Sequence, residues 1–207
     1  MPGRRSPSIA SRSDSRAIFL AILISRPLRV ARYSIPMSKA IFDELVLESA
    51  TELFLSRGMS IRRGQAVSGP IEYAATLGFS ADKVRGMIGL GMDPNTLQGL
   101  VRCDRDAGPD PNLEDWLAES VNQLLGRLKN KLVAYDLVVS LALPTVLRGI
   151  HLRFMHGQKS GLWTYSFECD AGPVCVWLDV RRDPDFVLVP TRDPAQQAVP
   201  EGELVLF

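Results

Sequence analysis

The chain has 207 residues, of which 46% are hydrophobic and 23% are charged. This length suits one globular domain with tails, and it can bury a sizeable core. The formal net charge of +1 is unevenly distributed, because residues 1–36 hold seven arginines and one acid, Asp14, for a sum of +6. The remainder therefore carries −5, and a mildly acidic body argues against nucleic acid as the main partner.

The cysteines and histidines give no sign of a disulfide framework or a metal site. Cys103, Cys169 and Cys175 are odd in number and have no paired spacing. Cys169 and Cys175 flank an expected turn, so they are either cross-strand neighbours or, as we expect, reduced thiols of a cytoplasmic protein. His151 and His156 lack the spacing of a metal pair. The sequence thus predicts no metal of its own.

Residues 1–36 differ from the rest of the chain. They are rich in Ser, Arg and Pro, and their apolar patch at residues 17–24 is too short to span a bilayer. A signal peptide is disfavoured because no small-x-small cleavage site follows the patch. We expect either a disordered extension or a mis-assigned start, since Met37 opens a clean helical pattern.

From Met37 onward, regular elements follow one another. Residues 38–57 show apolar side chains at helical spacing and end at Gly58, a common helix stop. Strands are expected at residues 61–67, 72–79 and 84–92. Residues 93–111 contain Pro, Gly and many polar side chains, and we predict a connection there without regular structure.

The second part of the chain repeats this order. A helix is expected over residues 112–134, and the apolar run 136–143, ended by Pro144, suits a well-buried strand. Alternating patterns predict half-buried strands at residues 150–155, 163–168 and 174–179, joined by turns at 156–161 and 170–173. Residues 183–207 form a tail rich in Pro and Asp.

Together these elements predict an α+β fold with two long helices on one face of a mostly antiparallel sheet of about six strands. Each half is a helix followed by strands, which suggests two related halves with pseudo-twofold symmetry. The domain is expected to span residues 37–182.

The expected helix at residues 112–134 carries the most informative pattern in the chain. At about 100° per residue, Asp115, Glu119 and Asn122 fall within about 60° on one face, with Gly126 on the same stripe. Apolar side chains gather on the other side and predict a buried face. Two plainer interpretations remain open: an ordinary solvated face, and a role for Asp115 at the positive end of the helix, three residues after Asn112.

This helix and the order of elements resemble the CheX/CheC family of chemotaxis phosphatases over roughly residues 37–182. The family motif is Asp or Ser, three residues, Glu, two residues and Asn on an exposed helix, followed here by Gly126-Arg127-Leu128-Lys129. The run Leu141-Ala142-Leu143-Pro144-Thr145-Val146 matches the family's strand that ends in Pro-x-Val. The first helix has Thr51 where the motif requires Asn, so the chain looks like single-site CheX rather than two-site CheC.

The resemblance implies a phosphatase that hydrolyses the aspartyl phosphate of a CheY-like receiver domain, with Mg²⁺ supplied by the receiver. Glu119 and Asn122 would be the catalytic residues: Asn122 positions the attacking water, and Glu119 contacts the receiver's lysine. Asp115 and Gly126 would assist docking. The alternative is a non-catalytic CheX-like module that binds receivers or dimerises. A cytoplasmic homodimer without membrane or nucleic-acid contacts is implied in either case.

Overall fold

The computed structural model describes residues 37–65, 69–153 and 161–191. The chain divides into two units, residues 1–34 and 35–207, and all described residues lie in the second. The predicted extension at residues 1–36 lies outside the described residues. The same holds for the end of the first expected strand at residues 66–67, for residues 156–160 of the turn at 156–161, and for the tail beyond residue 191.

The described part of the chain contains three α-helices, a short 3₁₀ helix and seven strands. The helices are α2 (Met37–Ser56), α3 (Pro94–Cys103) and α4 (Leu113–Leu132), and α4 continues into η1 (Val133–Tyr135). The strands are β1 (Ile61–Arg63), β2 (Tyr73–Ser80), β3 (Val84–Met92), β4 (Ser140–Leu141), β5 (Thr145–Arg148), β6 (Gly161–Cys169) and β7 (Gly172–Arg182).

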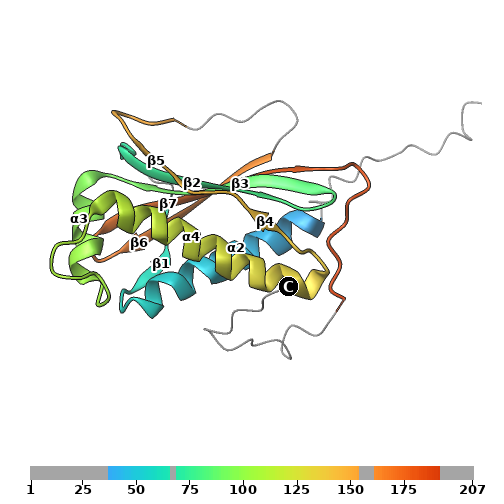
Figure 1. Ribbon diagram of the computed structural model, residues 1–207, viewed down its shortest axis with the longest axis horizontal. Coiled ribbons are helices and arrows are strands. Elements are labelled where there is room, and N and C mark those ends of the chain that lie inside the picture. Colours follow the sequence, from blue (N-terminus) through green and yellow to red (C-terminus); the bar gives the residue numbers. More distant parts are fainter. Residues whose placement is uncertain (1–36, 66–68, 154–160, 192–207) are drawn as a thin grey trace, which may run out of the picture. The chain divides into compact units, whose positions relative to one another are not determined.

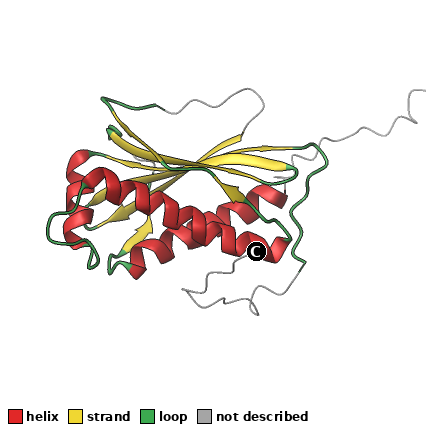
Figure 2. Ribbon diagram, in the orientation of Figure 1, coloured by secondary structure: helices red, strands yellow, loops and turns green. Residues whose placement is uncertain are grey.

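All strands pair antiparallel in one sheet, in the order β1-β6-β7-β3-β2-β4. Strand β5 also pairs with β2, farther along the same edge that β4 occupies. Figures 1 and 2 show α2 and α4 side by side on one face of this sheet. Alternate residues of each central strand point toward the helices, for example Ile88 of β3 and Leu178 of β7, which are fully buried. The core therefore lies between the two long helices and the sheet.

The strand order is a palindrome, which explains the two related halves expected from the sequence. Exchanging β1 with β5, β2 with β6 and β3 with β7 turns the order β1-β6-β7-β3-β2-β5 into its own reverse. The helices obey the same exchange, because a shift of 71 residues superimposes their buried positions. Ser49 of α2 corresponds to Ser120 of α4, and both serines are fully buried. The α+β class and the paired helices are thus as predicted.

The prediction of two helices and about six strands was wrong in its counts, chiefly because residues 93–111 hold a helix. Asp93 caps α3: its Oδ1 accepts from the backbone N–H groups of Asn95 and Thr96 at 2.9 and 3.1 Å. Pro94 occupies the first helical position, where its missing N–H costs nothing. Leu97, Leu100 and Val101 are buried. The sequence therefore did contain apolar residues at helical spacing, but the pattern covers little more than one turn.

Two strand predictions in the second half were also wrong. The run 136–143 is not a buried strand, because only Ser140 and Leu141 pair with β2 and both are exposed. Pairing resumes after Pro144 as β5, so the edge of the sheet is built from two short pieces. Residues 150–153 form no strand; Ile150 is 83% exposed and His151 has a left-handed φ of 53°. The remainder of that expected strand, from Phe154, lies outside the described residues.

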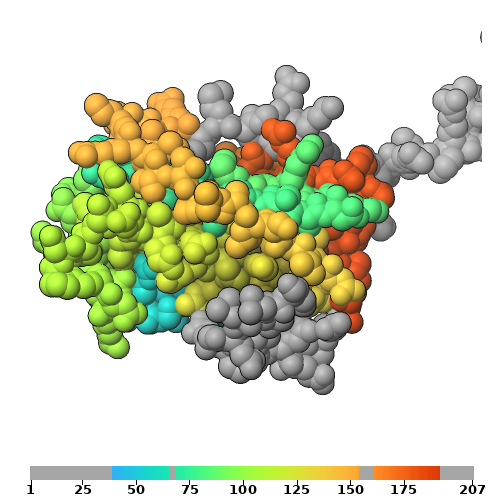
Figure 3. Space-filling model, viewed as in Figure 1, coloured from blue at the N-terminus to red at the C-terminus, as the bar shows by residue number. Residues whose placement is uncertain are grey.

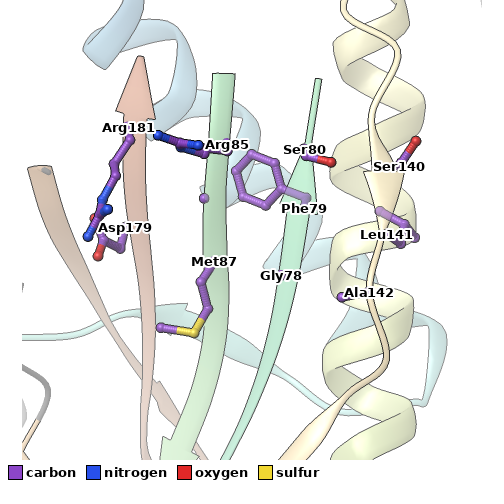
Figure 4. A pocket seen from close by; sticks show the side chains of 11 residues that line it. Gly78, Phe79, Ser80, Arg85, Met87, Ser140, Leu141, Ala142, Asp179 and Arg181 are labelled. Carbon is purple, nitrogen blue, oxygen red and sulfur yellow. The ribbon is translucent and has the colours of Figure 1, made fainter. Parts of the chain in front are cut away.

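The outer face of the sheet, opposite the helices, carries its own small cluster of Ala74, Cys175 and Trp177. Cys175 lies opposite Ser166 rather than Cys169, and all three cysteines are free. Farther along this face a shallow hollow opens beside β4, with Arg85 and Arg181 facing each other across β3 and β7 (Figure 4).

Candidate functional site

Helix α4 begins at a polar cap that fixes its register. The Oδ1 atom of Asn112 accepts hydrogen bonds from the backbone N–H groups of Glu114 and Asp115, at 2.8 and 3.1 Å. Glu114 and Asp115 fall in the first turn, where carboxylates suit the positive end of the helix dipole. Asp115 therefore takes part in the cap through its backbone, while its side chain stays exposed.

The predicted polar stripe lies at the surface of α4. Asp115, Glu119 and Asn122 are exposed and Gly126 is half-buried, all on one helix. Figure 3 shows α4 at the surface, between the segment of α3 with its following loop and the segment after residue 140. The opposite face is buried against the sheet through Trp116, Leu117, Val121, Leu124, Leu125, Leu128 and Leu132. An acid and an amide thus stand outward one turn apart.

Two carboxamides hold the Glu119 carboxylate. Gln123 donates from Nε2 to Glu119 Oε1 at 2.9 Å, and Asn122 donates from Nδ2 to Glu119 Oε2 at 3.4 Å. Each carboxylate oxygen has two lone pairs, so each retains capacity for a further donor. The Asn122 carboxamide oxygen, which does not take part in this bond, remains an acceptor.

A groove runs along one side of the stripe. Its walls are α4, the end of α2 and the loop after α3, and it is lined by Asp115, Glu119 and Gly126 among others. Asn122 does not line this groove and faces the adjacent side of the stripe. A methyl group added at Gly126 would meet no atom within 4 Å, so the packing of this chain does not require a glycine there.

The floor of the groove holds a buried arginine, which sequence reasoning missed. Arg57, just past the end of α2, donates from Nη1 to Ser120 Oγ at 2.7 Å and from Nη2 to Gln123 Oε1 at 3.2 Å. Its Nη1 also lies 3.5 Å from Asp104 Oδ2, and its guanidinium stacks 4.6 Å from the Trp116 ring centre. The same Asp104 oxygen accepts from Trp116 Nε1 at 2.6 Å.

Burial lowers the pKa of Arg57, against the opposing attraction of Asp104 and Glu119. The guanidinium nevertheless stays charged, because an arginine pKa lies far above neutral pH. No sequence signal identified Arg57, since Arg57-Gly58 reads as an ordinary helix end. Gln123 had a weak signal: it lies four residues after Glu119 on the same helix, where side chains meet.

The corresponding surface of α2 differs in its details. The shift of 71 residues places Glu48 at the position of Glu119 and Thr51 at that of Asn122. The Thr51 hydroxyl donates to the Leu47 carbonyl at 2.8 Å, and the Glu48 carboxylate pairs with Lys131 at 3.2 Å. Only α4 therefore presents the carboxylate and carboxamide together in the described domain.

Within residues 37–65, 69–153 and 161–191, no group of three or more His, Cys, Asp or Glu side chains is arranged to hold a metal ion. None of the helices that the structure describes is both long and apolar enough to cross a bilayer.

Comparison with known proteins agrees with this fold. Residues 73–168 match the family described as chemotaxis phosphatase CheX. The chemotaxis protein CheX of Vibrio vulnificus has a similar structure, with a TM-score of 0.59 and 16% identity; the match covers 68% of this chain and 96% of that one. A CheC-like superfamily protein from Shewanella sp. PV-4 matches with a TM-score of 0.56 and 12% identity, over 68% and 97% of the two chains.

A third similar structure is the CheX-CheY-BeF3-Mg²⁺ complex of Borrelia burgdorferi, with a TM-score of 0.54 and 18% identity over 68% of this chain and 98% of that one. No relative was detected among curated proteins.

Two long helices on one face of a palindromic antiparallel sheet give this chain the fold of the CheX and CheC-like structures that it matches. The family match and the similar structures confirm the resemblance inferred from the sequence: residues 73–168 match the CheX family, and the domain has the fold of CheX proteins.

Proposed function

We propose that this protein is a CheX-like phosphatase, which removes the phosphoryl group from the aspartyl phosphate of a CheY-like receiver domain. The observation that carries the proposal is the outward pair of Glu119 and Asn122 on α4. The family description and the similar complex, in which a CheX protein is seen with CheY, support the same partner class.

The chemistry requires little from the protein beyond positioning. An acyl phosphate is already activated, and the receiver supplies the Mg²⁺ that neutralises the phosphoryl oxygens, so this chain needs no cofactor of its own. What remains is to hold a water in line with the phosphorus. The Asn122 carboxamide oxygen accepts a hydrogen bond from that water and, because it is uncharged, does not repel the phosphoryl group.

The other residues of the stripe align the receiver. Glu119 has free lone pairs that accept from the ammonium group of the receiver's active-site lysine, which fixes the approach of Asn122. Asp115 adds a docking contact one turn earlier. Gly126 lets the receiver's backbone approach α4 closely, which explains a mid-helix glycine that costs about 1 kcal/mol relative to alanine and that no internal contact requires.

The alternative is a CheX-like module that binds receivers or dimerises without hydrolysis. Self-association has support of its own, because the short strands β4 and β5 leave Leu141, Leu143 and Leu147 exposed at the sheet edge. We propose a cytoplasmic homodimer through this edge.

The test is dephosphorylation of Mg²⁺-loaded, phosphorylated receivers with and without the protein. The wild type accelerates phosphate loss, and Asn122→Ala lowers kcat by roughly 100-fold while circular dichroism remains unchanged. Gln98→Ala, a truncation of an exposed amide on α3, is the matched control. Receiver binding without any acceleration, across all receivers of the source organism, would favour the non-catalytic module.

A further inference from the structure

The residues around Glu119 form one continuous chain of an ion pair and hydrogen bonds from the core to the surface. Asp104 and Arg57 lie at the buried end, Gln123 in the middle, and Glu119 and Asn122 at the exposed end. Asp104 comes from the end of α3, Arg57 follows α2, and the other three residues lie on α4. Three separate elements therefore contribute to the geometry of the catalytic pair.

Chemistry fixes the orientation of both amides in this chain. An arginine only donates, so the Gln123 group that faces Arg57 must be its oxygen, and its NH₂ group consequently points to Glu119. An ionised carboxylate only accepts, so Asn122 must also present its NH₂ group to Glu119. The Asn122 oxygen is then the part that remains for a water.

The buried end of the chain is well anchored. Arg57 is only 5% exposed, and it is held by Ser120 and stacked on Trp116 in addition to its contact with Asp104. Ser120 in turn donates to the Trp116 carbonyl at 2.6 Å. An arginine fixed on several sides has lost its rotamer freedom on folding, so it provides a rigid reference for Gln123.

We propose that Gln123, oriented by Arg57, is a positioning residue of the phosphatase: it immobilises Glu119, which turns the Asn122 carboxamide so that its oxygen faces the attacking water. This role rests on the proposed function of the Glu119 and Asn122 pair. Gln123 does not touch the phosphoryl group, and its effect passes entirely through Glu119.

Two substitutions separate positioning from simple packing. Gln123→Met keeps the shape but loses both hydrogen bonds. Gln123→Glu still accepts from Arg57, but its carboxylate cannot donate to Glu119 and instead places a like charge one turn away, where it repels. A packing role predicts little harm from either substitution, because both keep the shape of the side chain, whereas the positioning role predicts harm from both.

The experiment measures kcat and KM for receiver dephosphorylation with these variants and with Gln98→Met, which makes the same exchange at an exposed site on α3. We expect kcat to fall about tenfold in both Gln123 variants, as for a loosened positioning group, with KM within about threefold of wild type and no change in Gln98→Met. A wild-type kcat in Gln123→Glu would overturn the proposal.

A second measurement distinguishes this proposal from failure of the proposed function. In the free protein, NMR of the Asn122 side-chain NH₂ group reports its bond to Glu119 without any receiver. We expect Gln123→Met to shift and broaden this signal and to speed its exchange with water, and Gln98→Met to leave it unchanged. An unaltered Asn122 signal in Gln123→Met would refute the positioning chain, whether or not the wild type hydrolyses any receiver.

Discussion

Replacing Arg57 with methionine tests the buried network that supports the site. Arg57 is 5% exposed and the Asp104 side chain only 3%, so the substitution leaves a carboxylate in the interior without its cation. Breaking such a pair costs about 3–5 kcal/mol. Because Trp116 still donates to Asp104 at 2.6 Å, we expect the lower end, about 3 kcal/mol.

Urea unfolding followed by tryptophan fluorescence measures this loss, and the melting temperature of a domain this size should fall by about 6–12 °C. The double variant Arg57→Met/Asp104→Asn should recover at least half of the loss, since an uncharged amide still accepts from Trp116 and needs no cation. A cost below about 1 kcal/mol for Arg57→Met, with no recovery in the double variant, would show that Asp104 is solvated and the network unimportant.

Two further predictions concern single positions. Gly126→Ala should raise the free energy of unfolding by about 0.5–1 kcal/mol, because alanine suits a helix interior and meets no atom here. Steady-state kinetics should show a KM several-fold higher with kcat unchanged. An unchanged KM would contradict close approach of the receiver at this residue. Burial raises the pKa of the Cys175 thiol from 9.0 to about 11. Between these values the folded state keeps a proton that the unfolded state releases. The free energy of unfolding should therefore fall by about 2–3 kcal/mol as pH rises from 9 to 11. Urea midpoints at pH 8 and 11 should show a smaller decline in Cys175→Ala, and an equal decline would refute this origin.

The sequence predicted the site helix well because its signals are local. The buried stripe of α4 follows a helical period over five turns, and Asn112 supplies a cap at the right place. The strands β2 and β3 are likewise defined by alternation and by the turn between them. Such patterns are decided within one element, so they can be recognised without knowledge of its neighbours.

The features that were missed depend on contacts between distant residues. The support of Glu119 comes from Arg57, which reaches α4 from 63 residues away in the sequence. The run 136–143 was read as a buried strand because it is apolar, yet β4 and β5 lie at a sheet edge, where burial depends on what covers them. Helix α3 is only ten residues long, too short for its periodicity to outweigh its polar surroundings.

The internal repeat makes α2 a natural test of what the site requires. Thr51→Asn would complete the Glu-x-x-Asn spacing with Glu48, but two features of this surface oppose activity. Lys131 holds Glu48 at 3.2 Å and Glu52 at 2.7 Å. Partial burial lowers the pKa of Lys131, but its bonds to Glu52 and Glu48 outweigh this and raise the pKa overall, so the lysine stays charged.

The second feature is Leu55, which occupies the position of Gly126 and is 56% exposed, where it would meet an approaching receiver. We therefore expect Thr51→Asn to restore no activity to the Asn122→Ala protein in the dephosphorylation assay. Adding Lys131→Met and Leu55→Gly frees the carboxylate and clears the surface, and should produce measurable hydrolysis. Activity from Thr51→Asn alone would mean that the Glu-x-x-Asn spacing suffices, and that neither a free carboxylate nor a small residue on the next turn matters.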